Sequence, residues 1–151
     1  MKRRDQIKLT LAEQEEFLSK APKAALATLD KDGYPHVVAM NYLWQDGAIL
    51  MTSYGKAQKV LNARRDPRVG VMVETGRAYA DLRGVLIRGE CEIVEDVATV
   101  NATMHAIRNR YSGGGGGAEN TALTTAPKRV VMKVIPRKIT SWDHSKLAGV
   151  Y

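Results

Sequence analysis

The sequence predicts a mainly β protein, a six- to seven-stranded antiparallel barrel with a few peripheral helices. Seven segments alternate in polarity or are rich in β-branched residues, whereas three segments have helical spacing or helix-start signals. The dipeptide Asp46-Gly47 stands between two of the apolar segments, as in a two-residue hairpin turn. Many strands with few helices favour a barrel.

The first expected element is a short helix from Leu11 to about Lys20. Thr10 and Glu13 form a T-x-x-E capping box, in which the hydroxyl and the carboxylate each bond an unpaired backbone N–H. We expect this helix to cover one end of the barrel.

Seven strands are expected after this helix. Glycine accepts the positive φ of a tight turn, so the two strands on either side of Asp46-Gly47 should pair with each other. The expected strands are Ala24–Leu29, Val37–Trp44, Ala48–Thr52, Val69–Glu74, Ala80–Val94, Val130–Ile135 and Lys138–Trp142.

The second strand of this hairpin leads into a helix with a polar, basic entrance. Thr52–Gly55 fill the entrance, and the helix body from Lys56 to Arg65 ends at Asp66-Pro67, because residues before proline avoid the α region. A helix N-terminus presents unpaired N–H groups and a partial positive charge, so hydroxyls and lysines beside it would hold a phosphate. The alternative is a surface helix that Thr52 and Ser53 merely cap.

A third helix is expected over Asp96–Tyr111, where apolar residues recur at helical spacing. The glycine run Gly113–Gly117 follows it, within the segment 112–127. This run lacks the Gly-Lys-Ser/Thr ending of a phosphate loop and follows a helix instead of preceding one. We therefore expect a flexible loop, and we hypothesise that it acts as a lid over a cofactor.

The length and composition fit one domain over residues 1–151. The chain is 44% hydrophobic, and its single cysteine, Cys91, lies in the strand-like run GECEIV, which favours a buried thiol over a nucleophile. The N-terminus lacks the apolar core of a signal peptide, and no apolar run approaches the roughly 20 residues of a membrane span. We expect a cytoplasmic protein.

The net charge of +7 favours an acidic partner, which could be nucleic acid, a membrane surface or an anionic cofactor. Nucleic-acid binding is disfavoured, because the basic residues are spread along the chain and aromatic residues make up 6% of it. We expect no metal site, since His36, His105 and His144 are far apart in sequence and Cys91 has no partner at ligand spacing. Redox chemistry would then reside in a bound cofactor.

Four segments carry a resemblance, namely Ala24–His36, the strand pair around Asp46-Gly47, Lys59–Val69 and Ile139–Gly149. Taken together, they resemble the split-barrel flavin-binding family that includes pyridoxamine 5′-phosphate oxidase and the deazaflavin (F420)-dependent reductases. The last of them is similar to the ending of the actinobacterial reductase branch. The chain has Gln58-Lys59 where the oxidase has an Arg-Lys pair, and it lacks the oxidase's C-terminal segment with arginine and histidine, so pyridoxamine phosphate oxidation is not expected.

The resemblance implies a homodimer with two cofactor sites at the subunit interface, the phosphate on the helix entrance and the ring on the strand before it. Trp142 and His144 would reach the neighbouring subunit's site, unless Trp142 closes the barrel. Tyr54 and Tyr79 are candidate proton donors, and no residue is assigned as catalytic. The implied cofactor-binding residues are His36, Val37, Val38, Ala39, Met40, Thr52, Ser53, Lys56, Gln58, Lys59 and Trp142.

The function implied by the resemblance is hydride transfer between reduced F420 and an unsaturated or conjugated small organic acceptor. One alternative on the same fold is an FMN-dependent oxidase or reductase, because the phosphate end of either cofactor requires the same local binding groups. A second alternative is a non-catalytic carrier of a cofactor or of haem.

Overall fold

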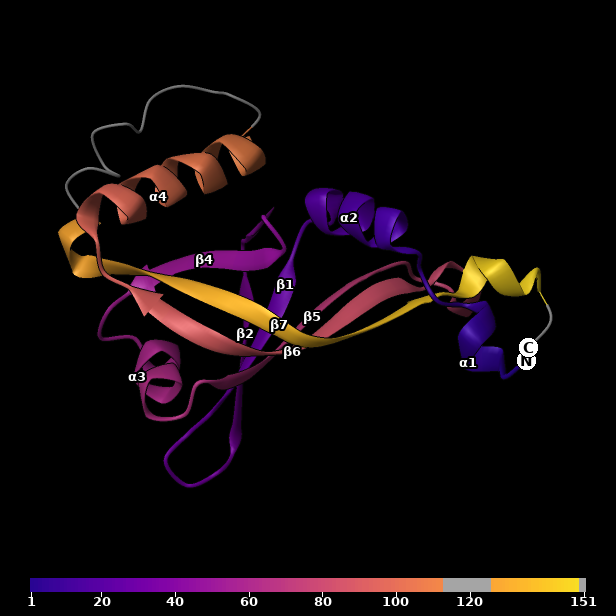
Figure 1. Ribbon diagram of the computed structural model, residues 1–151, viewed down its shortest axis with the longest axis horizontal. Helices are drawn as coiled ribbons and strands as arrows, with labels where there is room; N and C mark the ends of the chain where they lie inside the picture. The colour runs from indigo at the N-terminus through magenta and orange to yellow at the C-terminus, as the bar shows by residue number, and fades with distance from the viewer. Residues whose placement is uncertain (113–125, 150–151) are drawn as a thin grey trace.

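Residues 1–112 and 126–149 are described by the computed structural model, in which antiparallel β-structure dominates (Figure 1). Seven strands form one antiparallel sheet in the order β2-β1-β5-β6-β7-β4-β3, which confirms the mainly β prediction. The strands are β1 (Ala24–Leu29), β2 (Pro35–Met40), β3 (Leu43–Gln45), β4 (Ala48–Tyr54), β5 (Arg68–Thr75), β6 (Arg83–Val94) and β7 (Arg129–Asp143). In the same residues the helices are α1 (Arg3–Gln6), α2 (Leu11–Lys20), α3 (Gln58–Arg65) and α4 (Val97–Ser112), with the short 3-10 helices η1 (Tyr79–Asp81), η2 (Ala126–Lys128) and η3 (His144–Leu147).

The sheet curls into a half-barrel because its two edge strands are neighbours in sequence. Strands β2 and β3 lie at opposite ends of the strand order, yet only Asn41 and Tyr42 separate them along the chain. Such a connection covers three Cα–Cα steps of about 3.8 Å, so the two ends of the sheet lie within about 11 Å of each other at this point.

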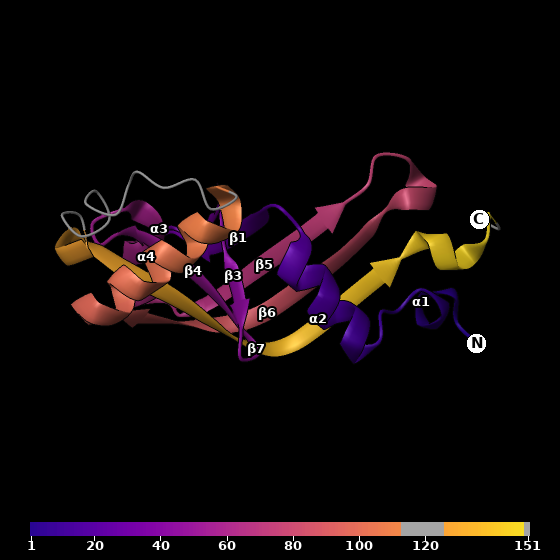
Figure 2. The same ribbon diagram turned by 90° about the horizontal axis from the view of Figure 1, so that it is seen from above.

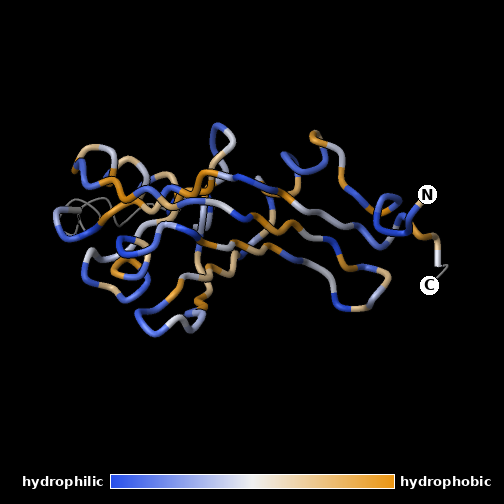
Figure 3. Tube along the Cα trace, turned by 60° about the horizontal axis from the view of Figure 1, so that its bottom comes forward, coloured by the Kyte–Doolittle hydropathy of each residue, from blue (hydrophilic) through white to orange (hydrophobic). Residues whose placement is uncertain are grey.

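The concave side of the half-barrel holds the hydrophobic core. Along β4, Ile49 and Met51 are buried in this core, while Leu50 between them faces outward. Phe17 and Leu18 of α2 join the same core, so this helix covers the interior as expected. Figure 3 shows hydrophobic positions concentrated along the strands and hydrophilic ones at the turns that join them. Each fully buried aliphatic side chain contributes about 1.5–3 kcal/mol of hydrophobic free energy.

The prediction of one strand over Val37–Trp44 was wrong. The segment divides at Asn41-Tyr42 into β2, which pairs with β1, and β3, which pairs with β4. The turn at Asp46-Gly47 is confirmed, with φ of 51° and 73°, both in the left-handed region that a type I′ turn requires. The alternation of apolar residues continues through both strands, so it does not reveal that the chain crosses from one sheet edge to the other.

The two expected strands Val130–Ile135 and Lys138–Trp142 are one long strand, β7. Pairing with β6 continues through an irregularity at Arg88/Gly89, where Gly89 stands opposite Pro136. A proline cannot donate a ladder hydrogen bond, and a bulge is where a sheet tolerates it. The expected strand over Ala80–Val94 begins later, at Arg83, because η1 precedes it.

The three expected helices are present, and the short helix α1 was not predicted. The capping box of α2 is formed, with Glu13 N donating to Thr10 Oγ1 at 3.2 Å and Thr10 N donating to Glu13 Oε2 at 2.7 Å. Helix α4 matches the expected third helix to within one residue at either end. Helices α2 and α3 pack on the interior core through Leu18 and Val60, whereas α4 packs on the outward face of β4 and β7 (Figure 1). The expected Gly113–Gly117 loop lies outside the described residues.

Three long strands, β5, β6 and β7, extend from the half-barrel into an arm that carries η1 and η3 (Figures 1 and 2). The N-terminal segment lies along the arm, since Asp143 N donates to the carbonyl oxygen of Ile7 at 2.7 Å. Lys146 Nζ also donates to the carbonyl oxygen of Lys8 at 2.8 Å. No helix in the described part of the chain has the length and apolarity needed to cross a membrane.

Candidate functional site

The α3 entrance, which we define as Tyr54–Lys59, joins β4 to helix α3. The helix begins at Gln58, two residues later than expected, because β4 continues to Tyr54 and Gly55 N still donates to the carbonyl oxygen of Lys128 at 3.0 Å. Ala57 is the N-cap residue and provides no side-chain cap. Within the described residues, the N–H groups of Gln58 and Lys59 have no backbone or side-chain acceptor. The entrance is therefore an uncapped helix N-terminus.

The prediction that Thr52 and Ser53 fill the helix entrance was wrong, because both are residues of β4. Ser53 is 4% exposed and lies on the interior face with Met51. Thr52 is half-buried and lies on the outward face, like Tyr54. Successive side chains of a strand point to opposite faces, so the two hydroxyls do not converge.

The ammonium groups of the two entrance lysines have no partner among the described residues. Lys56 is exposed and Lys59 is half-buried, and neither forms an ion pair or a side-chain hydrogen bond with any described residue. Gln58 is engaged, since its Nε2 donates to Asn62 Oδ1 at 2.7 Å. Asn62 is fully buried and donates from Nδ2 to Thr28 Oγ1 at 3.1 Å, which ties α3 to β1. Lys59 is thus presented by an anchored helix, and Lys56 by the turn that precedes it.

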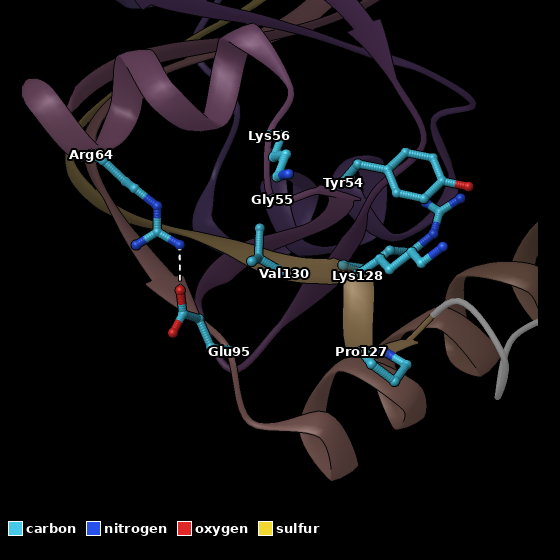
Figure 4. Close-up of a pocket in the computed structure, with 9 residues that line it drawn as sticks. Tyr54, Gly55, Lys56, Arg64, Glu95, Pro127, Lys128 and Val130 are labelled. Atoms are coloured by element: carbon cyan, nitrogen blue, oxygen red, sulfur yellow. Dashed lines mark hydrogen bonds and ion pairs between the residues drawn. The ribbon is translucent and has the colours of Figure 1, made fainter.

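A pocket of about 840 Å³ lies beside the α3 entrance, and its lining is rich in basic residues (Figure 4). Glu95 is the one acidic residue of the lining, and it pairs with Arg64 at 2.5 Å. Arg129 lies over the Tyr54 ring at 4.1 Å from its centroid, and its buried Nε has no hydrogen-bond partner in the described residues. The pocket is lined by Tyr54, Gly55, Lys56, Arg64, Glu95, Pro127, Lys128, Arg129 and Val130.

Three residues of this basic pocket, Arg64, Lys128 and Arg129, were not predicted from the sequence. Arg129 reaches it through the register of the β4–β7 pair, in which it stands opposite Tyr54. That register joins segments about 75 positions apart in the chain. A basic residue at the start of the expected strand at Val130 was the only local signal.

The expected ring strand, β2, places its side chains on two faces. His36, Val38 and Met40 point toward the interior, whereas Val37 and Ala39 are exposed on the outward face. His36 stands opposite Thr28 in the β1–β2 ladder, and its buried Nδ1 has no hydrogen-bond partner in the described residues. An outside ligand would therefore meet Val37, Ala39 and the free backbone edge of β2.

Trp142 lies in the arm, far from the α3 entrance of the same chain. Its indole covers Gly84, where an added Cβ would be 2.4 Å from the ring, and its Nε1 donates to Glu74 Oε2 at 2.9 Å. From Arg129 at the basic pocket to Trp142, β7 spans roughly 40 Å at about 3.3 Å per residue. Trp142 thus lies on the sheet surface outside the core cluster.

The other residues considered from the sequence lie in packed surroundings. His144 packs against the Tyr79 ring, with centroids 4.4 Å apart, and its Nδ1 lies 2.8 Å from the Tyr79 carbonyl oxygen. Cys91 is 5% exposed, and burial raises the pKa of its thiol to about 12, so it stays protonated at neutral pH. Among residues 1–112 and 126–149, no three His, Cys, Asp or Glu side chains gather in a way that could hold a metal ion.

Several solved structures resemble this chain. A conserved hypothetical protein from Mycobacterium tuberculosis is 36% identical, with all of this chain and 95% of that chain covered and a TM-score of 0.91. An F420 reductase is 28% identical, with 83% of this chain and 94% of that chain covered and a TM-score of 0.67. HutZ, a haem storage protein from Vibrio cholerae, is 15% identical over 89% of this chain and 97% of that chain, with a TM-score of 0.69, and shows the fold alone.

A search of curated proteins found no match. The sequence profile described as pyridoxamine 5′-phosphate oxidase matches residues 10–143, from the N-cap of α2 to the last residue of β7. That match takes in all seven strands, the α3 entrance and the basic pocket. The chain therefore belongs to the pyridoxamine 5′-phosphate oxidase family.

Proposed function

We propose that the protein is a cytoplasmic oxidoreductase that binds F420 and transfers a hydride between the reduced deazaflavin and an unsaturated or conjugated small organic acceptor. The family has oxidoreductase members, and one similar structure is an F420 reductase. The observation that carries the proposal is the uncapped α3 entrance beside a basic pocket. Its two lysines have no ion-pair or side-chain hydrogen-bond partner among the described residues. An anionic cofactor is the kind of ligand that such a site attracts.

The phosphate is proposed to lie at the α3 entrance. Lys56 and Lys59 would neutralise it, and the free N–H groups of Gln58 and Lys59 would donate to its oxygens. Thr52 on the outward face of β4 is the hydroxyl that could join them, whereas the interior orientation of Ser53 removes its hydroxyl from this set. The unpartnered Nε of Arg129 in the adjoining pocket is a further donor for an anionic group.

The ring is proposed to lie along β2, which is an edge strand of the sheet. Val37 and Ala39 would contact the ring face, and the unpaired edge of the His36–Met40 backbone would offer N–H and C=O groups to its polar rim. The bound deazaflavin supplies the hydride, and the protein binds it, orients it and excludes water.

A homodimer is proposed as the working form. Cross-strand register lines up Ala39, Ala25, Met72 and Leu86 on the outward face of the sheet, and Met72 and Leu86 are 43% and 37% exposed. A second copy would cover this apolar row. Trp142 could then contribute to a site only on the partner, because it lies too far from the α3 entrance of its own chain.

An FMN-dependent oxidase or reductase is the second candidate. The uncapped entrance and its lysines would bind the phosphate of FMN as well as that of F420. A non-catalytic carrier is a third possibility, because no side chain of the site is assigned to chemistry.

The experiment that tests the proposal is a parallel titration of the apo-protein with F420 and with FMN at modest salt, followed by cofactor fluorescence. Selective F420 binding supports the reductase and calls for a screen of conjugated acceptors. Selective FMN binding moves the function to flavin chemistry. Tight binding of either cofactor without turnover across the acceptor screen favours the carrier, and binding of neither contradicts the proposal.

Charge reversal at Lys59 gives the first prediction. Lys59→Glu should weaken cofactor binding tenfold to a hundredfold, because about 1.5–3 kcal/mol of charge-assisted hydrogen bonding is lost. Lys20→Glu is the matched control, since Lys20 is an exposed lysine of α2 paired only with Glu16. An unaltered dissociation constant in folded Lys59→Glu protein would remove Lys59 from the phosphate site.

A further inference from the structure

Arg110, near the end of α4, binds backbone carbonyl groups from two other segments. Its Nη1 donates to the carbonyl oxygen of Tyr42 at 2.7 Å, and its Nη2 donates to the carbonyl oxygens of Ala21 at 2.6 Å and Ser19 at 3.3 Å. Tyr42 lies between β2 and β3, while Ser19 and Ala21 lie at the C-terminal end of α2. One guanidinium group thus ties three segments together.

Two tyrosines complete this cluster, which we call the junction clamp (Arg110, Tyr42 and Tyr111). The guanidinium carbon of Arg110 lies 4.5 Å from the Tyr42 ring centroid and 4.8 Å from the Tyr111 ring centroid. Tyr42 N donates to the Tyr111 hydroxyl at 3.2 Å, and Arg110 Nη1 also bonds that hydroxyl. The Tyr42 hydroxyl, fully buried, donates to the carbonyl oxygen of Leu18 at 2.6 Å. A planar guanidinium suits such a site better than an ammonium group, because it donates in several fixed directions and stacks on rings.

The clamp sits where the half-barrel is joined by chain connectivity alone. In the described part of the chain, β2 and β3 are the two ends of the strand order, so no ladder of backbone hydrogen bonds joins them. Asn41 and Tyr42 form the connection, and β3 pairs in turn with β4. The hydrogen-bond ladders of the sheet therefore do not set the separation of β2 and β4 at this point, where Tyr42 links the two halves.

We propose that Arg110 is a positioning residue that sets the distance between β2 and β4 by holding Tyr42. This inference rests on the proposed function, in which the cofactor ring lies along β2 and its phosphate lies at the end of β4. A rigid cofactor that bridges the two strands fits only one separation. A ligand that occupies the α3 entrance alone does not depend on that separation.

The test compares three variants of the full chain. Arg110→Met keeps an apolar stem of similar length and removes every donor, and Arg110→Lys keeps the charge but loses the planar fork. Lys20→Met is the matched control, because it removes a positive charge at the same end of α2 and leaves the carbonyl groups bound by Arg110. Each variant is titrated with F420 and FMN, and inorganic phosphate is then used as the competitor. Amide hydrogen exchange is measured on the same proteins.

Arg110→Met should weaken cofactor binding at least tenfold, while the inhibition constant of inorganic phosphate changes less than twofold. Exchange of the amides of residues 38–43 should rise at least tenfold, with exchange in the arm unchanged. Arg110→Lys should fall between Arg110→Met and wild type, and Lys20→Met should match wild type.

Two results would overturn the inference. One is a folded Arg110→Met protein that binds cofactor and phosphate as wild type does. The other is a parallel loss of both ligands with faster exchange throughout the molecule, which marks a general structural role. If wild-type protein binds neither cofactor, the proposed function fails separately. The exchange of residues 38–43 then decides whether Arg110 holds the junction, and an unchanged rate counts against it.

Discussion

Tyr42 is a fully buried phenol whose ionisation is coupled to folding. Burial raises its pKa to about 12, and the nearby Arg110 guanidinium only partly offsets this effect. The neutral hydroxyl donates to the carbonyl oxygen of Leu18, a bond that the phenolate cannot make. The folded chain therefore holds a proton that an unfolded tyrosine releases near its ordinary value of 10.

A pH prediction follows for Tyr42. Its contribution to stability is complete below about pH 10 and is lost as the pH rises toward about 12, since the unfolded chain then binds fewer protons than the folded one. Tyr42→Phe lacks this term, so the difference in urea unfolding midpoint between wild type and Tyr42→Phe should shrink from pH 9 to pH 11. An equal difference at the two pH values would show that the phenol is not coupled to folding.

The pairing of β6 and β7 illustrates how one glycine positions an element. Gly84 stands opposite Trp142 in the ladder, and the indole lies across the space that a side chain would occupy. This placement allows Trp142 Nε1 to reach Glu74 on β5, across the strand between them. The missing Cβ of Gly84 is therefore a packing requirement of the arm.

Gly84→Ala should displace the Trp142 indole and break its bond to Glu74. The added Cβ would lie 2.4 Å from the ring, and overpacking of this kind costs about 1–3 kcal/mol. The measurement is the emission spectrum and urea midpoint in a Trp44→Phe background, which leaves Trp142 as the sole tryptophan. Gly70→Ala is the control, because its Cβ would meet the Ala27 methyl group at an ordinary 3.8 Å. An unshifted emission spectrum in Gly84→Ala would contradict the predicted displacement.

The whole molecule combines a half-barrel with an arm formed by β5, β6 and β7 (Figure 2). The arm carries Tyr79, Trp142 and His144. The exposed apolar row on the outward sheet face and the distance from Trp142 to the α3 entrance both favour a second copy as partner. Stable homodimers bury about 800 Å² or more per partner. A sheet face formed by several strands provides a surface of that area.

The dimer prediction is tested by sedimentation equilibrium. Wild-type protein should sediment at twice the chain mass of 16.6 kDa, and Met72→Glu should sediment at the single-chain mass because it places a charge in the apolar row. Leu11→Glu should stay dimeric, since Leu11 is an exposed apolar residue of α2, away from that row. A monomeric wild-type protein at micromolar concentration would contradict the homodimer.

Features with local causes could be predicted from the order of residues alone. The capping box of Thr10 and Glu13, the turn at Asp46-Gly47 and the end of α3 before Pro67 each depend on a few adjacent residues. The basic residues around Lys59 likewise pointed to the α3 entrance from composition and order alone, although their role stays a prediction.

Which segments pair with each other depends on the folded arrangement of the whole chain. The strand pattern of Val37–Trp44 is the same whichever partner it pairs with, so the division at Tyr42 became visible only in the sheet order. Ser53 faces inward and Arg129 reaches the basic pocket because of a register set by distant residues. Arg110 acquires its hydrogen bonds in the same way, to three backbone carbonyl groups that folding brings together. These contacts join residues that are far apart in the sequence, so local sequence preferences do not reveal them.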